Sequence, residues 1–115
     1  MTDQETFNKV KEHLLTQNRK SYDTYVGCMY RNADGLKCAI GCLIPDLLYH
    51  PGIEKEPVTH LATRNDGLGL FLQQFNLPLL EELQGIHDCT PTDEWPDKLK
   101  LVAERFKLDY FYSWS

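Results

Sequence analysis

The sequence predicts an α+β fold that is mostly helical, with four or five helices around a small β-hairpin or short sheet. Two observations lead to this prediction. Apolar residues recur at helical spacing along most of the chain, whereas residues 22–44 combine β-favouring side chains with a strong turn signal. A chain of 115 residues can bury one modest core, so we expect a single domain over residues 1–115.

The first helix is expected over residues 2–17. Phe7, Val10 and Leu14 recur at helical spacing, and Thr2 with Glu5 three residues later fits a capping box. The same apolar spacing, interrupted by turn-forming residues, predicts further helical segments over residues 46–49, 58–62, 68–75, 79–87 and 95–106.

The β element is expected between the first two helical segments. Residues 25–31 favour a strand, and Asp34-Gly35 is a turn signal. The apolar run 38–44 should be buried, but its periodicity leaves open whether it is a strand or a helical turn. Residues 51–57 have the composition of a loop, with three exposed charged residues expected at Glu54, Lys55 and Glu56.

The C-terminal segment 108–115 is rich in aromatic residues. Tyr110, Tyr112 and Trp114 share one side if the segment is extended, which suits docking on the core, a strand beside residues 25–31, or a subunit contact. Docking on the core is the preferred interpretation, because an exposed aromatic patch favours aggregation.

Composition and charge exclude several classes of protein. Twelve Lys and Arg against 17 Asp and Glu give a net charge of −5, which argues against general nucleic-acid binding. No apolar run approaches the roughly 20 residues that span a bilayer. The first residues lack the pattern of a signal peptide, so we expect a cytoplasmic protein.

The four cysteines are interpreted as free thiols in a reducing compartment. Zinc ligation by Cys38, Cys42, Cys89 and His87 is the alternative, but no Cys-x-x-Cys turn is present, so neither a metal nor another cofactor is predicted. A cysteine nucleophile with His87 and Asp88 is not predicted either, because adjacent helical residues point about 100° apart.

One motif has a recognisable pattern. Cys28-Met29-Tyr30-Arg31 is followed over residues 35–46 by Gly-Leu-Lys-Cys-Ala-Ile-Gly-Cys-Leu-Ile-Pro-Asp. This motif, together with segments 83–88 and 95–106, resembles a family of small uncharacterised bacteriophage proteins. The resemblance implies a phage accessory protein in the host cytoplasm, a class in which inhibitors of host defence are frequent, and it implies no mechanism.

The motif also places two cations around a turn. Arg31 and Lys37 flank a glycine-containing turn, where they could hold a phosphate or carboxylate. Solvated charges beside a hairpin are the alternative interpretation. Residues 1–64 hold eight cations and eight acids, whereas residues 65–115 hold four cations and nine acids, so an anion is expected in the first half.

We therefore expect a non-catalytic protein that binds a small anionic, nucleotide-like ligand. The expected ligand-binding residues are Tyr30, Arg31, Lys37, Arg64 and His87. A homo-oligomer, most simply a two-fold dimer, is expected because subunit interfaces readily form nucleotide pockets. The alternatives are a module that binds a host protein through its acidic half and aromatic tail, and a small nucleotide hydrolase that uses His87 and an acid.

Overall fold

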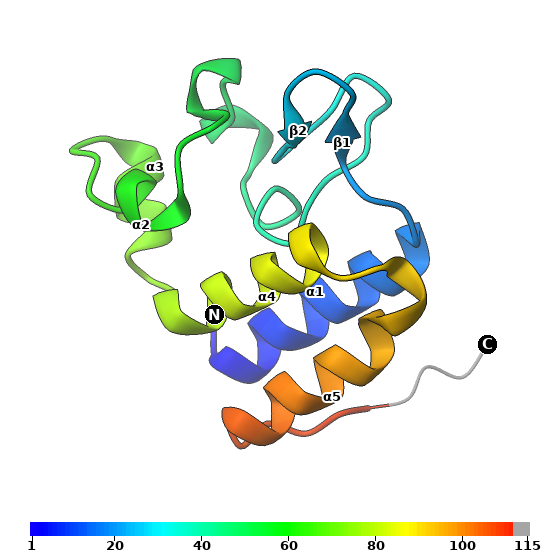
Figure 1. Cartoon of the computed structure of the whole chain (residues 1–115). Helices are drawn as coiled ribbons and strands as arrows, with labels where there is room; N and C mark the ends of the chain where they lie inside the picture. The colour runs from blue at the N-terminus through cyan, green and yellow to red at the C-terminus, as the bar shows by residue number, and fades with distance from the viewer. Residues whose placement is uncertain (112–115) are drawn as a thin grey trace.

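The structure is a computed structural model that describes residues 1–111, and it confirms the mostly helical α+β fold. Three short 3₁₀ turns, η1 to η3, cover Asp46–Leu48, Pro51–Ile53 and Thr92–Glu94. The helices and strands, labelled in Figure 1, are α1 (Asp3–Gln17), β1 (Tyr22–Asp23), β2 (Gly27–Cys28), α2 (Val58–Leu61), α3 (Gly67–Leu72), α4 (Leu77–Cys89) and α5 (Trp95–Arg105).

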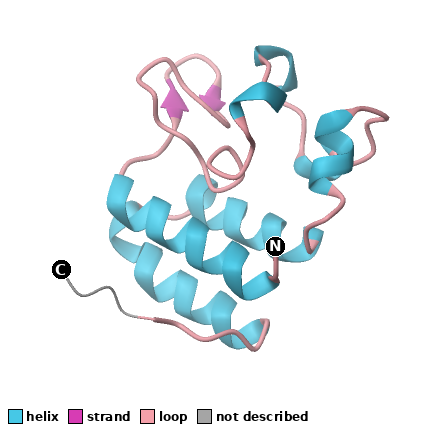
Figure 2. Cartoon of the chain, turned by 180° about the vertical axis from the view of Figure 1, so that it is seen from behind, coloured by secondary structure: helices cyan, strands magenta, loops and turns pink. Residues whose placement is uncertain are grey.

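The three long helices form a bundle, and the shorter elements cover one side of it. Helices α1, α4 and α5 contact one another pairwise, while the hairpin, the 31–56 loops and α2–α3 lie above them in Figure 1. The same two-part arrangement is seen from behind in Figure 2. Buried side chains between the long helices, such as Phe7, Leu83 and Leu99, form the centre of the core.

Local capping explains where the helices begin. Thr2 and Glu5 form the predicted capping box of α1. Asn76 caps α4, since its side chain accepts a hydrogen bond from the Leu79 amide. Helix α4 begins two residues earlier than predicted, because Pro78 lies in its first turn, where a missing N–H breaks no helical hydrogen bond.

The predicted strand over residues 25–31 is confirmed only at Gly27–Cys28, which forms β2, and Arg31 adds an isolated bridge with Lys37. Tyr25 and Val26 lie in the turn between β1 and β2, which form a two-stranded antiparallel sheet. The Asp23 carboxylate accepts hydrogen bonds from the amides of Tyr25 and Val26 at 2.8 and 3.0 Å, and Gly27 follows with φ of 93°. This side-chain-stabilised turn outweighs the β propensity of the two exposed residues.

The apolar run 38–44 forms a buried series of turns rather than a strand. The amide of Cys42 donates to the carbonyl of Cys38, and that of Ile44 donates to Ile40, as in a helical turn. Gly41 is required here, because a Cβ would overlap the carbonyl oxygen of Tyr30. The motif that carries the family resemblance thus packs its turn tightly against Tyr30.

The C-terminal segment docks on the core, as predicted, as far as residue 111. Tyr110 makes an edge-to-face contact with Phe7, with ring centroids 6.2 Å apart. Within residues 1–111, strands β1 and β2 pair only with each other, so no described part of the tail joins them. Tyr112 and Trp114 lie outside the described residues.

The two ends of the described chain are joined by hydrogen bonds. The side chain of Gln4 donates to the carbonyl of Asp109 at 2.9 Å and accepts from its amide at 2.8 Å. The buried ammonium of Lys11 donates to the carbonyl of Phe111 and lies 4.6 Å from the centre of the Tyr110 ring. The segment after α5 therefore stabilises α1 directly. No helix in the described part of the chain is long and apolar enough to cross a membrane.

Candidate functional site

A cavity lies between α4 and the loops that cover it. It has a volume of about 410 Å³, which is within the range of small-molecule sites. We call it the Tyr30 pocket. Three parts of the chain line it, namely residues 28–30, residues 54–59, and the side of α4 formed by Glu81, Gln84, Gly85 and Asp88.

Glu54 organises one wall of the Tyr30 pocket. Its carboxylate accepts hydrogen bonds from the amides of Tyr30 and Arg31 at 2.9 and 3.2 Å and from the Tyr49 hydroxyl at 2.7 Å. The expectation that Glu54 is an exposed loop residue is therefore wrong, because it is partly buried and ties its loop to the motif. Burial and the neighbouring Glu54 carboxylate raise the pKa of Tyr49 to about 12.

Lys55 and Glu56 continue this wall. Lys55 adopts φ of 74°, a left-handed conformation that is unfavourable for a residue with a Cβ. Glu56 is half-buried, contrary to the sequence expectation, and its carbonyl accepts a hydrogen bond from the Tyr30 hydroxyl. Burial raises the pKa of that hydroxyl well above its ordinary value, so Tyr30 acts as a neutral donor. The strained Lys55 backbone thus turns both neighbouring glutamates toward the Tyr30 pocket.

Gly85 lies in the middle of α4 and lines the Tyr30 pocket. An added Cβ at this position would meet no atom within 4 Å. The situation differs from that of Gly41 and Gly69, where a Cβ would overlap a backbone carbonyl. Open space in front of Gly85 belongs to the cavity and not to a packing contact.

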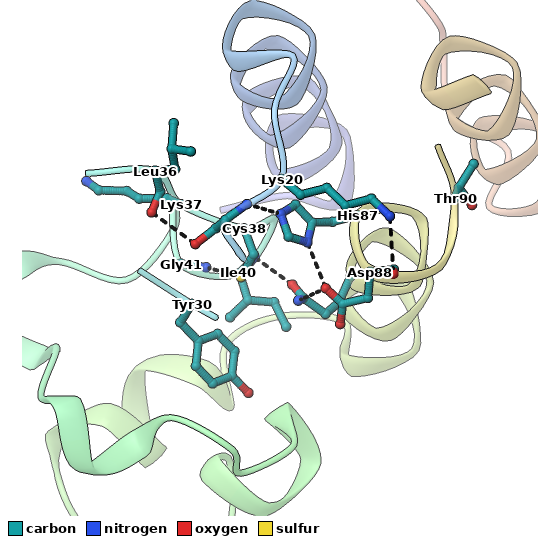
Figure 3. Close-up of polar contacts among 12 residues, drawn as sticks. Lys20, Tyr30, Leu36, Lys37, Cys38, Ile40, Gly41, His87, Asp88 and Thr90 are labelled. Atoms are coloured by element: carbon teal, nitrogen blue, oxygen red, sulfur yellow. Dashed lines mark hydrogen bonds and ion pairs between the residues drawn. The ribbon is translucent and has the colours of Figure 1, made fainter. Parts of the chain in front are cut away.

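Beside the pocket, His87 connects α4 to the start of β1. Its side chain is completely buried and stacks on Trp95 with ring centroids 5.7 Å apart. The amide of Ser21 donates to Nε2 at 2.9 Å, and Nδ1 lies 2.7 Å from Oδ1 of Asp88 (Figure 3). Since Nε2 accepts a hydrogen bond, the ring proton is on Nδ1, which donates a hydrogen bond to the Asp88 carboxylate.

The expectation that Asp88 would not meet the His87 ring is wrong. The angular separation of adjacent residues applies to their Cα–Cβ bonds, and beyond Cβ the two side chains bend toward each other. Gln84 also donates to Asp88, at 2.9 Å. Burial raises the pKa of Asp88, and the hydrogen bonds from His87 and Gln84 outweigh this effect, so the pKa lies below its usual value.

The thiol of Cys28, which was not expected to take part in a site, joins this group. The ligand atoms of Cys28, His87 and Asp88 lie within 4.8 Å of one another. Burial and the Asp88 carboxylate raise the pKa of the Cys28 thiol to about 11, so it is not a thiolate at neutral pH. Both nitrogens of His87 are already engaged. The geometry therefore resembles a Cys-His-Asp group but lacks an activated nucleophile and a free base.

A metal fits this group poorly. If a metal bound Nδ1, the ring proton would move to Nε2. Nε2 would then point an N–H group at the Ser21 amide instead of accepting a hydrogen bond from that amide. Within residues 1–111, Cys28, His87 and Asp88 form the one cluster with metal-ligand spacing, so the alternative zinc set of Cys38, Cys42, Cys89 and His87 is not assembled. All four cysteines are free thiols, as predicted.

The three cations expected to bind an anion do not converge. The Arg31 guanidinium donates to Asp46 at 2.8 Å and to the carbonyl of Ile44 at 2.6 Å, and it stacks on the Tyr49 ring. Arg31 therefore connects η1 to the motif, as a structural residue does.

Arg64 and Lys37 have separate surroundings. Arg64 pairs with Asp66 at 2.8 Å and with Glu56 at 3.5 Å, near the start of α3. Lys37 forms an isolated antiparallel bridge with Arg31, and its side chain makes no ion pair within the described residues. Of the five expected ligand-binding residues, Tyr30 alone lines the Tyr30 pocket.

Most residues of the Tyr30 pocket were missed because they are far apart in the sequence. Glu81 and Gln84 lie on the face of α4 that apolar spacing marks as solvated, and Asp88 lies at its end. One signal was present in the sequence. Gly85 interrupts an otherwise strongly helix-forming segment, and such a glycine in a helix interior usually has a packing or functional reason.

Comparison with known proteins identifies no relative, because the chain matches no family model, no curated protein and no solved structure. The resemblance to bacteriophage proteins therefore stays a prediction.

Proposed function

We propose that the protein is a non-catalytic binding protein that takes up a small molecule in the Tyr30 pocket. The observation that carries this proposal is Gly85. A glycine in a helix interior costs about 1 kcal/mol relative to alanine, and no neighbouring atom requires it here. The glycine is explained if it keeps the cavity open for a ligand. The strained backbone of Lys55, which also lines the cavity, supports the same proposal.

The lining indicates the chemistry of the ligand. Four carboxylates line the Tyr30 pocket, against the single ammonium of Lys55. Those of Glu54 and Asp88 are occupied by internal hydrogen bonds, whereas the Glu81 carboxylate makes no hydrogen bond or ion pair within residues 1–111. Met29, Pro57 and Val58 add apolar surface, so we propose a ligand with an apolar or aromatic body and an amino group directed at Glu81.

The predicted anionic, nucleotide-like ligand fits the charge of this pocket less well than a ligand with an amino group does. The exocyclic amino group of a nucleobase would suit Glu81, but the phosphates would be repelled by the carboxylates unless they reached Lys55 or solvent. Nucleosides are therefore proposed to bind more tightly than their phosphates. A role against host defence follows only from the family resemblance and is a prediction.

Hydrolysis and host-protein binding receive less support. A hydrolase using His87 would need a free ring nitrogen, and both are hydrogen-bonded. A host-protein interface formed by the acidic half and aromatic tail stays a prediction, as does the dimer.

The test begins with native mass spectrometry of freshly purified protein, followed by titration with nucleosides, nucleotides and aliphatic amines. We expect a compound bearing an amino group to bind the wild-type protein and to be recovered intact. Gly85→Phe should fill the pocket and abolish binding, and Glu81→Gln should weaken it by about tenfold or less, since an exposed ion pair contributes little.

Two controls make this experiment decisive. Glu104→Gln removes an exposed carboxylate on α5, outside the pocket lining, and should leave the affinity unchanged. Gly85→Phe must keep the wild-type circular dichroism spectrum. Undiminished binding in a folded Gly85→Phe variant would place the ligand elsewhere and refute the proposal, and conversion of the ligand would favour an enzyme.

A further inference from the structure

The lining of the Tyr30 pocket carries more negative charge than the protein itself neutralises. It contains four carboxylates, those of Glu54, Glu56, Glu81 and Asp88. The Glu56 carboxylate pairs with Arg64 at 3.5 Å. Within residues 1–111, no lysine or arginine forms an ion pair with any of the other three. Three carboxylates without a cationic partner therefore share one cavity.

Nearby basic groups leave most of that charge in place. The Lys55 side chain belongs to the lining but is exposed. The ammonium of Lys20 donates to the backbone carbonyl of Asp88 at 3.5 Å, not to its carboxylate, and Lys20 does not line the pocket. His87 is uncharged, because its Nε2 accepts a hydrogen bond. With Glu56 neutralised by its partner, three carboxylates against the one ammonium of Lys55 leave the lining with a net charge of −2.

These negative charges are spread along the cavity. Glu81 and Asp88 lie on the same face of α4, two helical turns or about 10 Å apart along the axis, with Gly85 between them. In the part of the chain that the structure describes, Glu54, Glu81 and Asp88 do not form a group with metal-ligand spacing. A single metal ion cannot reach all three carboxylates, so the arrangement favours an elongated ligand whose positive charges are themselves separated.

Asp88 has an oxygen left for such a ligand. The hydrogen bonds from His87 and Gln84 both end on Oδ1. The side chain is 32% exposed, and its Oδ2 accepts no hydrogen bond from a nitrogen or hydroxyl donor of residues 1–111. The thiol of Cys28 beside it is a weak donor. Oδ2 can therefore accept a hydrogen bond from an ammonium group in the cavity.

We propose that the ligand of the Tyr30 pocket carries two ammonium groups, as a linear diamine or polyamine does; this rests on the proposed function, which requires only one. One ammonium group pairs with Glu81 and the other with Asp88, and the methylene chain between them crosses the open space in front of Gly85. An extended aliphatic chain advances about 1.25 Å per bond, so about eight or nine bonds span the distance of about 10 Å between the two acidic residues.

The test compares amines by isothermal titration calorimetry at physiological ionic strength. 1,8-Diaminooctane and octylamine have the same chain and differ by one ammonium group, so the diamine should bind about three- to tenfold more tightly. Spermidine, whose terminal nitrogens are separated by the same number of bonds, should resemble 1,8-diaminooctane. 1,4-Diaminobutane is too short to reach both carboxylates and should lack this advantage.

Asp88→Asn tests the second contact. Asparagine keeps an oxygen for the hydrogen bonds from His87 and Gln84 but removes the charge. The variant should bind octylamine as the wild-type protein does and should lose the preference for the diamine. Glu81→Gln should lose the same preference without altering the contact to His87, and it replaces Asp88→Asn if that variant has an altered circular dichroism spectrum.

Asp97→Asn is the matched control, because Asp97 is an exposed residue of α5 outside the pocket lining, and this variant should keep the preference for the diamine. Equal losses in Asp88→Asn and Asp97→Asn would show a general attraction of dications to the acidic chain and overturn the proposal. Equal affinities of octylamine and 1,8-diaminooctane for the wild-type protein would also overturn it, while the proposed function would stand. If no amine binds, the proposed function fails as well.

Discussion

At the scale of single residues, Gly85 is expected to keep the cavity open and to make the folded protein less stable than alanine would. Because a Cβ at this position meets no neighbour and alanine is the better helix former, Gly85→Ala should raise the free energy of unfolding by about 1 kcal/mol. Urea denaturation measures the difference. A destabilised Gly85→Ala variant would mean that the glycine serves packing and would remove the main support for the proposed ligand site.

His87 is a second residue whose replacement has a defined cost. In His87→Phe the ring keeps its stacking partner Trp95, but the buried Ser21 amide loses its acceptor, while the partly exposed Asp88 carboxylate keeps the hydrogen bond from Gln84. An unsatisfied buried group costs about 1–3 kcal/mol, so we expect a loss of about 1–3 kcal/mol in denaturation experiments. A change below about 1 kcal/mol would contradict the central role of this hydrogen-bonded group.

Asp88 makes the stability depend on pH. Its pKa is lowered in the folded protein, so its contribution is fully present above the pKa that the unfolded chain has, about 4. The contribution is lost as the pH falls through the lower folded value. The stability difference between the wild-type protein and Asp88→Asn should therefore be largest near neutral pH and should shrink in acid. A difference that does not vary with pH would contradict this linkage.

At the scale of secondary-structure elements, the helices were predictable because local signals agreed. In α1 the apolar stripe and the capping box indicate the same boundaries, and both are observed. A small hairpin was predicted in this region, but the position of its turn was not, because the Asp23 carboxylate holds the turn at residues whose own preference is extended. The run 38–44 was ambiguous, because burial on all sides removes the periodicity that separates strand from helix.

The cap of α4 offers a test at this scale. Asn76 accepts from the Leu79 amide and also donates to Asp3 of α1 at 3.0 Å. Asn76→Ala should cost about 1 kcal/mol in denaturation experiments, whereas Asn76→Asp keeps the cap but replaces the hydrogen bond to Asp3 by repulsion between two carboxylates. Equal stability of the alanine variant and the wild-type protein would show that Pro78 and tertiary packing set the start of α4 without the cap.

At the scale of the whole molecule, the Tyr30 pocket could not be predicted, because three distant segments form it. Residues 28–30 reach α4 only through the turns that place Tyr30 against Gly41. Residues 54–56 line the Tyr30 pocket because Glu54 is hydrogen-bonded to residues 30 and 31, and no local sequence pattern predicts these hydrogen bonds. Tyr30 was predicted as a binding residue, but its partners depend on tertiary contacts.

The docked C-terminal segment gives a prediction about the whole fold. Removing residues 109–115 would expose Phe7 and leave the buried ammonium of Lys11 without the Phe111 carbonyl and the Tyr110 ring. An uncompensated buried charge destabilises strongly, so the melting temperature of the shortened protein should fall clearly. Adding Lys11→Met to the shortened protein should recover part of the loss. Without such recovery, the lost Phe7 contact would account for the whole effect.

The hydrogen bonds between Gln4 and Asp109 also bear on how the protein is synthesised. Helix α1 leaves the ribosome long before α4, α5 and the closing segment, which are its packing partners. Throughout that interval the apolar side of α1 has nothing to cover it, and the nascent chain cannot complete its core. The core of the long helices can therefore form only after residues 95–111 have left the ribosome, and until then the emerging chain should bind chaperones more readily than the folded chain does.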